Sequence, residues 1–184
     1  MTARRMRFFA LIIVCLLGVS PAVAGGLDDM NRGSIALRQG DFAVAVEHMN
    51  AALASGALRA EAFAATLISR GQAHYHLENY RQAAEDLTAA IESGALNDTL
   101  VGIALASRAS AYRMSGELAR AVTDFDAAIT LGTVNEKIFF HRGLALEADG
   151  QRARAIEDFR RAYRLAPDNE KFRSKLLELG EKVD

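Results

Sequence analysis

The chain has 184 residues, of which 51% are hydrophobic, with only two prolines and no tryptophan. This composition predicts an ordered domain with a buried core and excludes a disordered chain. Lysine and arginine number 22 against 23 acidic residues, which gives a formal net charge of −1. Such a balance offers no broad cationic surface and argues against nucleic-acid binding.

Residues 1–24 have the three-part pattern of a secretory signal peptide. A basic start with three arginines precedes the apolar run 8–19, and Ala22 and Ala24 form a small-residue pattern before Gly25. The run has 12 residues, whereas a membrane-spanning helix needs about 20. We therefore expect cleavage before Gly25 and export to a bacterial periplasm. An uncleaved anchor that extends to Ala24 is the alternative.

The mature chain, residues 25–184, is expected to be a single domain without a disulfide. The only cysteine, Cys15, lies in the apolar run, and no small residues precede it as they would at a lipoprotein cleavage site. Loss of residues 1–24 removes three arginines, so 19 basic residues face 23 acidic ones and the net charge is about −4.

One pattern occurs four times along the mature chain. Each copy begins with a small residue after an arginine, and these small residues are separated by 38, 38 and 34 positions. They are Gly33, Gly71, Ala109 and Gly143. After a short polar or glycine-containing break come an alanine, a large apolar residue and a second alanine: Ala45, Met49, Ala52; Ala83, Leu87, Ala90; Ala121, Phe125, Ala128; and Ala155, Phe159, Ala162. This spacing is one face of an α-helix. Each copy is therefore predicted to be a helix, a tight turn and a second helix.

The breaks and the spacing predict where these helices end. Gly40, Gly116 and Gly150 can supply the positive φ that ends a helix. Four extra residues, about one helical turn, predict longer first helices over 60–77 and 97–114. After Pro167, the amphipathic stretch 168–182 predicts a helix that caps the stack. The expected repeats are 26–59, 64–97, 102–135 and 136–169.

The residues of these copies form a set that is also found in a known protein family. The second copy carries Leu67, Gly71, Tyr80, Ala83, Leu87 and Ala90, and the fourth carries Phe139, Gly143, Ala155, Phe159, Ala162 and Pro167. This set resembles the tetratricopeptide repeat (TPR) family. The resemblance implies an all-α, right-handed solenoid of antiparallel helix pairs. Its concave groove, lined mainly by the first helices, would hold a peptide or a helix of a partner protein.

The resemblance also implies which residues line that groove. By register they are Met30, Leu37, Ile68, Gln72, Tyr75, His76, Arg113, Met114, Lys137, Phe140 and Glu147. This largely apolar lining suits an amphipathic helix or an apolar strand. The alternative is that several of these residues only pack on adjacent helices.

Family members that bind the acidic C-termini of chaperones use a clamp of lysines, asparagines and arginine. The matching positions here hold Met30, Ser34, Ser69, Ile103 and Ser107, so that clamp is absent. A carboxylate would find no paired cation at these positions.

The repeated arginines have a structural explanation. Each stands 16 residues before an aspartate on the facing second helix, which predicts the pairs Arg70–Asp86, Arg108–Asp124 and Arg142–Asp158. In the first copy Arg32 meets His48 at this register, so we expect a weaker pair or none. Partly exposed pairs contribute only ~0.2–1 kcal/mol, so we interpret them as orienting the helices.

No residue pattern points to catalysis, a cofactor or a metal. His74 and His76 are two positions apart and leave a helix on different sides, unlike the i, i+4 pair of a helical metal site. His48 and His141 stand alone. Adjacent acidic residues such as Glu85 and Asp86 are typical of a solvated helix face. We therefore expect a protein that is not an enzyme and has no cofactor.

The sequence thus predicts a periplasmic adaptor or scaffold that binds a segment of a protein partner in its groove. One alternative is a self-assembling structural component of an envelope complex, in which another copy of the chain fills the groove. Another is the same adaptor tethered by the uncleaved segment, and only then would it contact a membrane.

Overall fold

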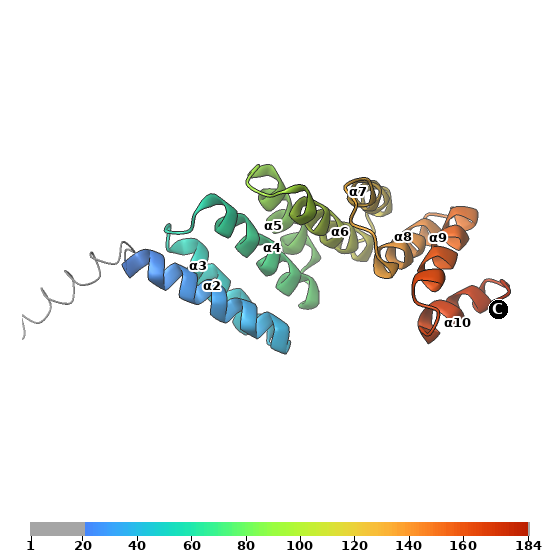
Figure 1. Cartoon of the computed structure of the whole chain (residues 1–184), viewed down its shortest axis with the longest axis horizontal. Helices are drawn as coiled ribbons and strands as arrows, with labels where there is room; N and C mark the ends of the chain where they lie inside the picture. Colours follow the sequence, from blue (N-terminus) through green and yellow to red (C-terminus); the bar gives the residue numbers. More distant parts are fainter. Residues whose placement is uncertain (1–20, 184) are drawn as a thin grey trace, which may run out of the picture.

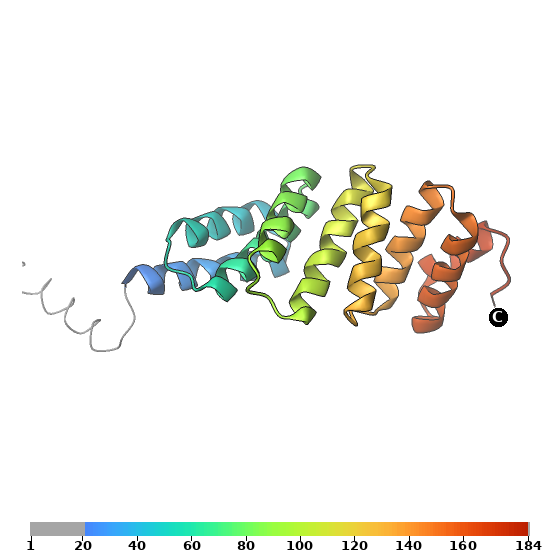
Figure 2. The ribbon, with the colours of Figure 1, turned by 90° about the horizontal axis from the view of Figure 1, so that it is seen from above.

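The computed structural model describes residues 21–183, and from Gly25 onward their side chains as well. The described part of the chain contains nine α-helices and no strand. Eight of them form consecutive pairs: α2 (Pro21–Gln39) with α3 (Phe42–Ala54), α4 (Ala60–His76) with α5 (Tyr80–Glu92), α6 (Asp98–Met114) with α7 (Leu118–Thr130), and α8 (Glu136–Ala148) with α9 (Arg152–Leu165). The pairs follow one another along the long axis, and α10 (Glu170–Glu178) lies at the C-terminal end (Figures 1 and 2). The predicted all-α solenoid is confirmed.

The helix boundaries follow the turn residues of the sequence. Gly40, Gly116 and Gly150 have φ angles of 86°, 83° and 78°. The second copy has no glycine at this place, and Glu78 takes the left-handed conformation instead with φ 61°, which a non-glycine residue rarely adopts. The first helices α4 and α6 have 17 residues and α8 has 13, as the longer spacing predicts. The capping helix α10 is shorter than expected and ends before Gly180, whose φ is 81°.

The two helices of a pair approach each other closely where the first helix has its small residue. A Cβ atom at Gly71 would lie 2.9 Å from Cγ of Leu87 and 3.1 Å from the carbonyl oxygen of Ala83. At Gly143 it would lie 2.7 Å from the ring of Phe159. The small residue therefore makes room for one large apolar side chain in each pair.

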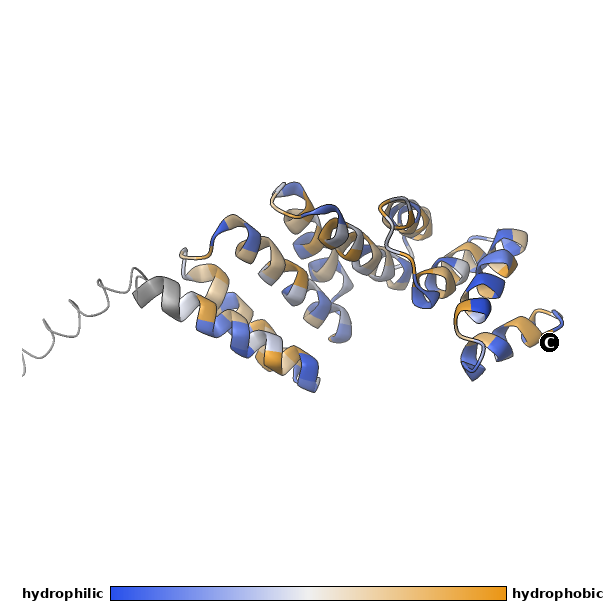
Figure 3. Cartoon of the chain, viewed as in Figure 1, coloured by the Kyte–Doolittle hydropathy of each residue, from blue (hydrophilic) through white to orange (hydrophobic). Residues whose placement is uncertain are grey.

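The core runs along the whole stack rather than around one centre. Met49, Leu87, Phe125 and Phe159 are at most 1% exposed, and the alanines on either side of each are fully buried. Hydrophobic and hydrophilic residues alternate around the helices, as Figure 3 shows. Because each pair covers one side of the next, the last pair needs a cover of its own, which α10 provides.

The predicted signal peptide falls almost entirely outside the described residues. Only residues 21–24 are described, and they belong to the start of α2. From Gly26 the chain packs on the first repeat, since a Cβ atom there would lie 2.5 Å from Oγ of Ser55. None of the helices between residues 21 and 183 is long and apolar enough to cross a membrane.

We expect Phe125→Ala to lower the free energy of unfolding by about 3–5 kcal/mol, because it opens a cavity in the continuous core. The matched control is Phe63→Ala, since Phe63 is 40% exposed and its truncation should cost about 1 kcal/mol or less. Urea unfolding followed by circular dichroism measures both. Equal losses would contradict the proposed role of Phe125 in the core.

Candidate partner-binding groove

A groove follows the first helices of the four pairs. One part of it is a cavity of about 290 Å³ with lining residues from α2, α4, α6 and α8. They are Leu37, Gln72, Tyr75, His76, Ser107, Ser110 and His141. A second cavity, of about 270 Å³, shares Ser107, Ser110 and His141 with the first and extends to Lys137 and Ile103. The two cavities form one continuous surface, called the groove below.

The structure brings five of the eleven predicted groove residues to these cavities. They are Leu37, Gln72, Tyr75 and His76 in the first cavity and Lys137 in the second. Four others lie outside both cavities: Met30, Arg113, Met114 and Glu147. Met114 is 42% exposed, and Glu147 forms an ion pair of 2.8 Å with Lys175 of α10.

Two of the predicted groove residues are buried instead. Ile68 is 5% exposed and packs in a cluster with Leu87 and Ala104. Phe140 is 3% exposed, and its ring centroid lies 5.5 Å from that of Phe159 and 4.8 Å from that of Phe172 in α10. The expectation that these two side chains meet a partner is therefore wrong, because neighbouring helices cover them.

Aromatic side chains hold one end of the groove in place. The rings of Phe42 and His76 are stacked, with centroids 4.3 Å apart and an angle of 7° between the planes. Tyr75 contacts His76 and Tyr80 edge to face, each at a centroid distance of 5.6 Å. Such contacts between α3, α4 and α5 fix the two groove residues Tyr75 and His76 in one orientation.

His141 is a groove residue that the sequence reasoning treated as isolated. Burial, followed by the charges of Arg113, Lys171 and Lys137, lowers the pKa of this imidazole to about 4, so His141 is neutral near pH 7. Its Nδ1 is buried and has no hydrogen-bond partner among the described residues, and the same holds for Nε of Arg113. Register was a usable signal, because His141 stands where the previous copy has the groove residue Ser107.

The structure contains the three arginine–aspartate pairs, each with two parallel hydrogen bonds. Arg108 donates from Nε and Nη2 to Asp124 at 2.7 and 2.9 Å. Arg142 donates in the same way to Asp158, at 2.7 Å in both bonds. The Arg70–Asp86 pair has distances of 2.8 and 2.5 Å. The side chains of Arg142 and Asp158 are only 12% and 3% exposed, so this pair is more buried than the sequence suggested.

Each of these arginines also reaches back to the preceding repeat. Nη1 of Arg70 donates to Asn50 at 2.7 Å, and Nη1 of Arg108 donates to Thr88 at 2.9 Å. Nη1 of Arg142 donates to Asp126 at 2.5 Å. The three acceptors occupy the same register on α3, α5 and α7. Each of these three arginines therefore connects two successive second helices: α3 and α5, α5 and α7, or α7 and α9.

The first copy lacks this arrangement. Arg32 pairs with Asp28 one turn earlier in α2, at 2.8 Å, and both side chains are about 60% exposed. His48 lies 3.2 Å from Asp29. The facing position holds a histidine, and Arg32 contacts a residue of its own helix.

The described residues contain no cluster that could hold a metal ion. Within this part of the chain, no group of three or more His, Cys, Asp or Glu side chains lies close enough together. Burial is the main cause that lowers the pKa of His74, whose Nδ1 also has no hydrogen-bond partner among the described residues. His74 and His76 therefore differ in environment and do not act as a pair.

Comparison with known families agrees with the repeat seen in the sequence. Two family models, both described as tetratricopeptide repeat, match the chain: one over residues 30–69 and 68–136, the other over residues 136–169. The chain belongs to the tetratricopeptide repeat family. No curated protein sequence matches it. This membership supports a role in protein–protein interaction.

Several solved TPR structures are similar to this one. MamA from Desulfovibrio magneticus RS-1 superposes with a TM-score of 0.67 at 18% identity, over 80% of this chain and 79% of that chain. YrrB, described as a TPR protein with an unusual peptide-binding site, has a TM-score of 0.65 at 20% identity, over 78% and 70%. Both likenesses show the fold alone. The first TPR of Spaghetti (RPAP3), bound to the HSP90 peptide SRMEEVD, has a TM-score of 0.57 at 25% identity, over 64% and 90%.

We expect a double-mutant cycle on Arg142 and Asp158 to give a coupling energy of about 2 kcal/mol, because the pair is bidentate and buried. The control cycle on the exposed pair Arg32 and Asp28 should give about 0.5 kcal/mol or less. Urea unfolding of the single and double alanine variants measures both energies. A coupling near zero for Arg142 and Asp158 would refute this assignment.

Proposed function

We propose that this protein is a periplasmic adaptor that binds a segment of a partner protein in its groove. The observation that carries the proposal is the groove itself, which side chains from the four first helices line together. No single helix could form such a surface, and an extended surface across several helices suits a peptide segment better than a small molecule.

The chemistry of the groove supports an amphipathic occupant. Leu37 and Tyr75 offer apolar contact at one end. Gln72, Ser107 and Ser110 offer groups that can donate or accept hydrogen bonds. A helix or strand with one apolar face and one polar face would satisfy both kinds of side chain.

Solved relatives add support from their stated ligands. One TPR neighbour is described as holding an HSP90 peptide and another as having a peptide-binding site. A peptide ligand is therefore compatible with this architecture, and we expect it to contact the groove residues above.

We expect a photocrosslinking residue at position 72 to capture one partner protein from periplasmic extract. Tyr75→Ala should reduce this capture at least about tenfold, because a buried aromatic contact is worth more than about 1.4 kcal/mol at an interface. The readout is mass spectrometry of the crosslinked species and of the peptides joined to position 72.

The matched control is Leu165→Ala, since Leu165 is 54% exposed and lines neither cavity. It should leave capture unchanged. Equal effects of Tyr75→Ala and Leu165→Ala would contradict the groove assignment. Capture of a second copy of this chain would favour a self-assembling component over an adaptor.

Export is the second half of the proposal. The pattern of residues 1–24 supports it. Intact-mass measurement of protein purified from a Gram-negative host should give an N-terminus at Gly25 in the periplasmic fraction. A product that starts at Met1 in the membrane fraction would favour the tethered form instead.

A further inference from the structure

Three basic side chains from three different helices lie near His141. They are Arg113 on α6, Lys137 on α8 and Lys171 on α10. Lys137 is one helical turn before His141, and both side chains line the second cavity. Nζ of Lys171 lies 5.1 Å from the ring centroid of Phe140, and that ring contacts the imidazole of His141 edge to face at 5.9 Å.

These three cations differ from the other basic residues nearby because no carboxylate neutralises them. Throughout residues 25–183, none of the ion pairs involves Arg113, Lys137 or Lys171. The next lysine of α10, Lys175, pairs with both Glu147 and Glu178. The buried Nε of Arg113 also has no hydrogen-bond partner in this part of the chain. Lys137 lines the second cavity, whereas Arg113 and Lys171 line neither cavity. The protein therefore carries unpaired positive charge both within this end of the groove and beside it.

The charges of the three side chains also affect the pKa of His141. Burial contributes most to the low pKa, and the charges of Arg113, Lys171 and Lys137 lower it further. Three positive charges thus act together at one imidazole. On the other side of His141, the first cavity brings Tyr75 and His76 from α4 and the hydroxyls of Ser107 and Ser110 from α6, and none of these side chains is a carboxylate.

We propose that Arg113, Lys137 and Lys171 form an anion-binding site beside His141, which holds a partner segment that carries neighbouring acidic side chains. The inference rests on the proposed function, since it names the chemistry of the segment in the groove. Cations on three helices can engage several carboxylates at once, and charge complementarity of this kind selects a partner.

The shape of the groove favours side-chain carboxylates within a segment over a single free anion. From His141 the groove continues past Ser110 to Tyr75 and Leu37, which are apolar contacts. An occupant with acidic side chains near α8 and apolar side chains near α4 would therefore satisfy both ends. The clamp positions in the first three copies hold no cation here, and in the fourth copy Lys137 stands at the register of Ile103.

Occupation of this site should make binding depend on pH. A bound carboxylate stabilises the protonated imidazole, so the pKa of His141 is higher in the complex than the value of about 4 in the free protein. The complex then takes up a proton at a higher pH than the free protein does, so affinity rises as the pH falls toward 4. His141→Gln should remove this pH dependence, because glutamine does not titrate.

The test uses a fluorescent peptide with the sequence Leu-Ala-Leu-Glu-Glu-Glu and a C-terminal amide. In the control peptide, glutamines replace the three glutamates. By fluorescence anisotropy at low salt, the glutamate peptide should bind at least about tenfold more tightly than the glutamine peptide, and this preference should shrink in high salt. NMR of the full mature protein should show the pKa of His141 rising when the glutamate peptide is added.

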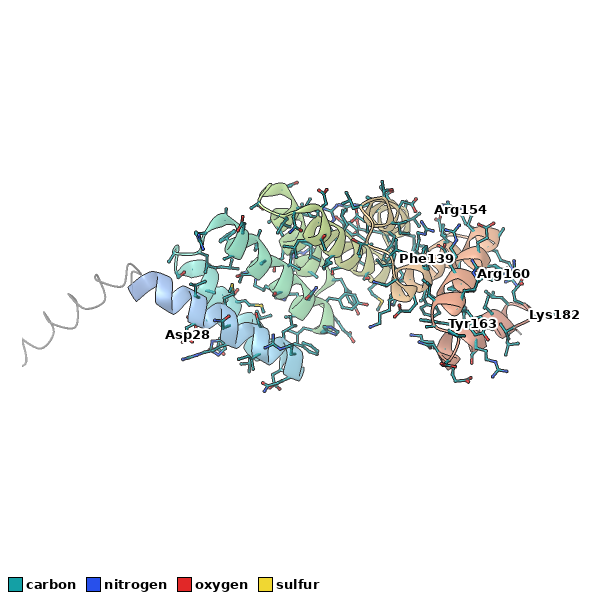
Figure 4. All side chains as sticks on the ribbon, viewed as in Figure 1. Asp28, Phe139, Arg154, Arg160, Tyr163 and Lys182 are labelled. Carbon is teal, nitrogen blue, oxygen red and sulfur yellow. The ribbon has the colours of Figure 1, made fainter. Side chains whose placement is uncertain are left out.

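Charge variants complete the test. Lys137→Gln with Lys171→Gln should abolish the preference for the glutamate peptide. Lys182→Gln should leave that preference unchanged, since Lys182 is exposed at the C-terminal end of the chain, beyond α10 (Figure 4). Equal binding of the two peptides, or equal effects of the two sets of variants, would overturn the proposal.

Two further outcomes distinguish recognition of acidic side chains from recognition of a chain end, and failure of the anion site from failure of the adaptor function. If the glutamine peptide gains affinity from a free C-terminal carboxylate while the glutamates add nothing, the site recognises a chain end and the proposal fails. If neither peptide prefers the site but crosslinking at position 72 still captures a partner that Tyr75→Ala loses, the anion site fails and the adaptor function stands.

Discussion

The contact between one small residue and one large residue in each helix pair determines the rest of the structure. At Gly71 there is no room for a Cβ atom without displacing Leu87 or the backbone of Ala83. The pair is therefore close enough to bury its alanines completely, and only the outer sides of the pair remain to pack on the next one. A chain built in this way grows along an axis and leaves a long face of first helices open.

The candidate groove residues lie on that open face. Tyr75 and His76 belong to it because α4 turns one side toward the groove, while Leu67 and Ala73 on the same helix face the core. The aromatic contacts to Phe42 and Tyr80 come from the second helices on either side. The framework thus sets the orientation of the groove side chains before any partner arrives, which lowers the entropy that binding would cost.

Much of this arrangement could be read from the sequence, because its causes are local or periodic. The helices follow from the 3.6-residue spacing, their ends from glycines such as Gly116, and the Arg108–Asp124 pair from a fixed register. Burial of Phe140 could not be read in the same way. It depends on where α10 lies against α8, a tertiary contact that no spacing within one repeat encodes. Arg113 and Lys137 are predicted groove residues, but the sequence could not show that Lys171 lies near them, since Lys171 comes from α10.

The arginines that join neighbouring repeats limit how far the stack of helices can bend. Arg142 binds Asp126 of α7 and Asp158 of α9 at once, and Arg70 and Arg108 bridge the earlier second helices likewise. A guanidinium is a rigid planar group, so it acts as a spacer that fixes how far apart successive outer helices stand. Bending the superhelix would have to stretch or break every spacer in turn. The spacing of the second helices thereby limits how far the groove, which follows the first helices, can widen or narrow.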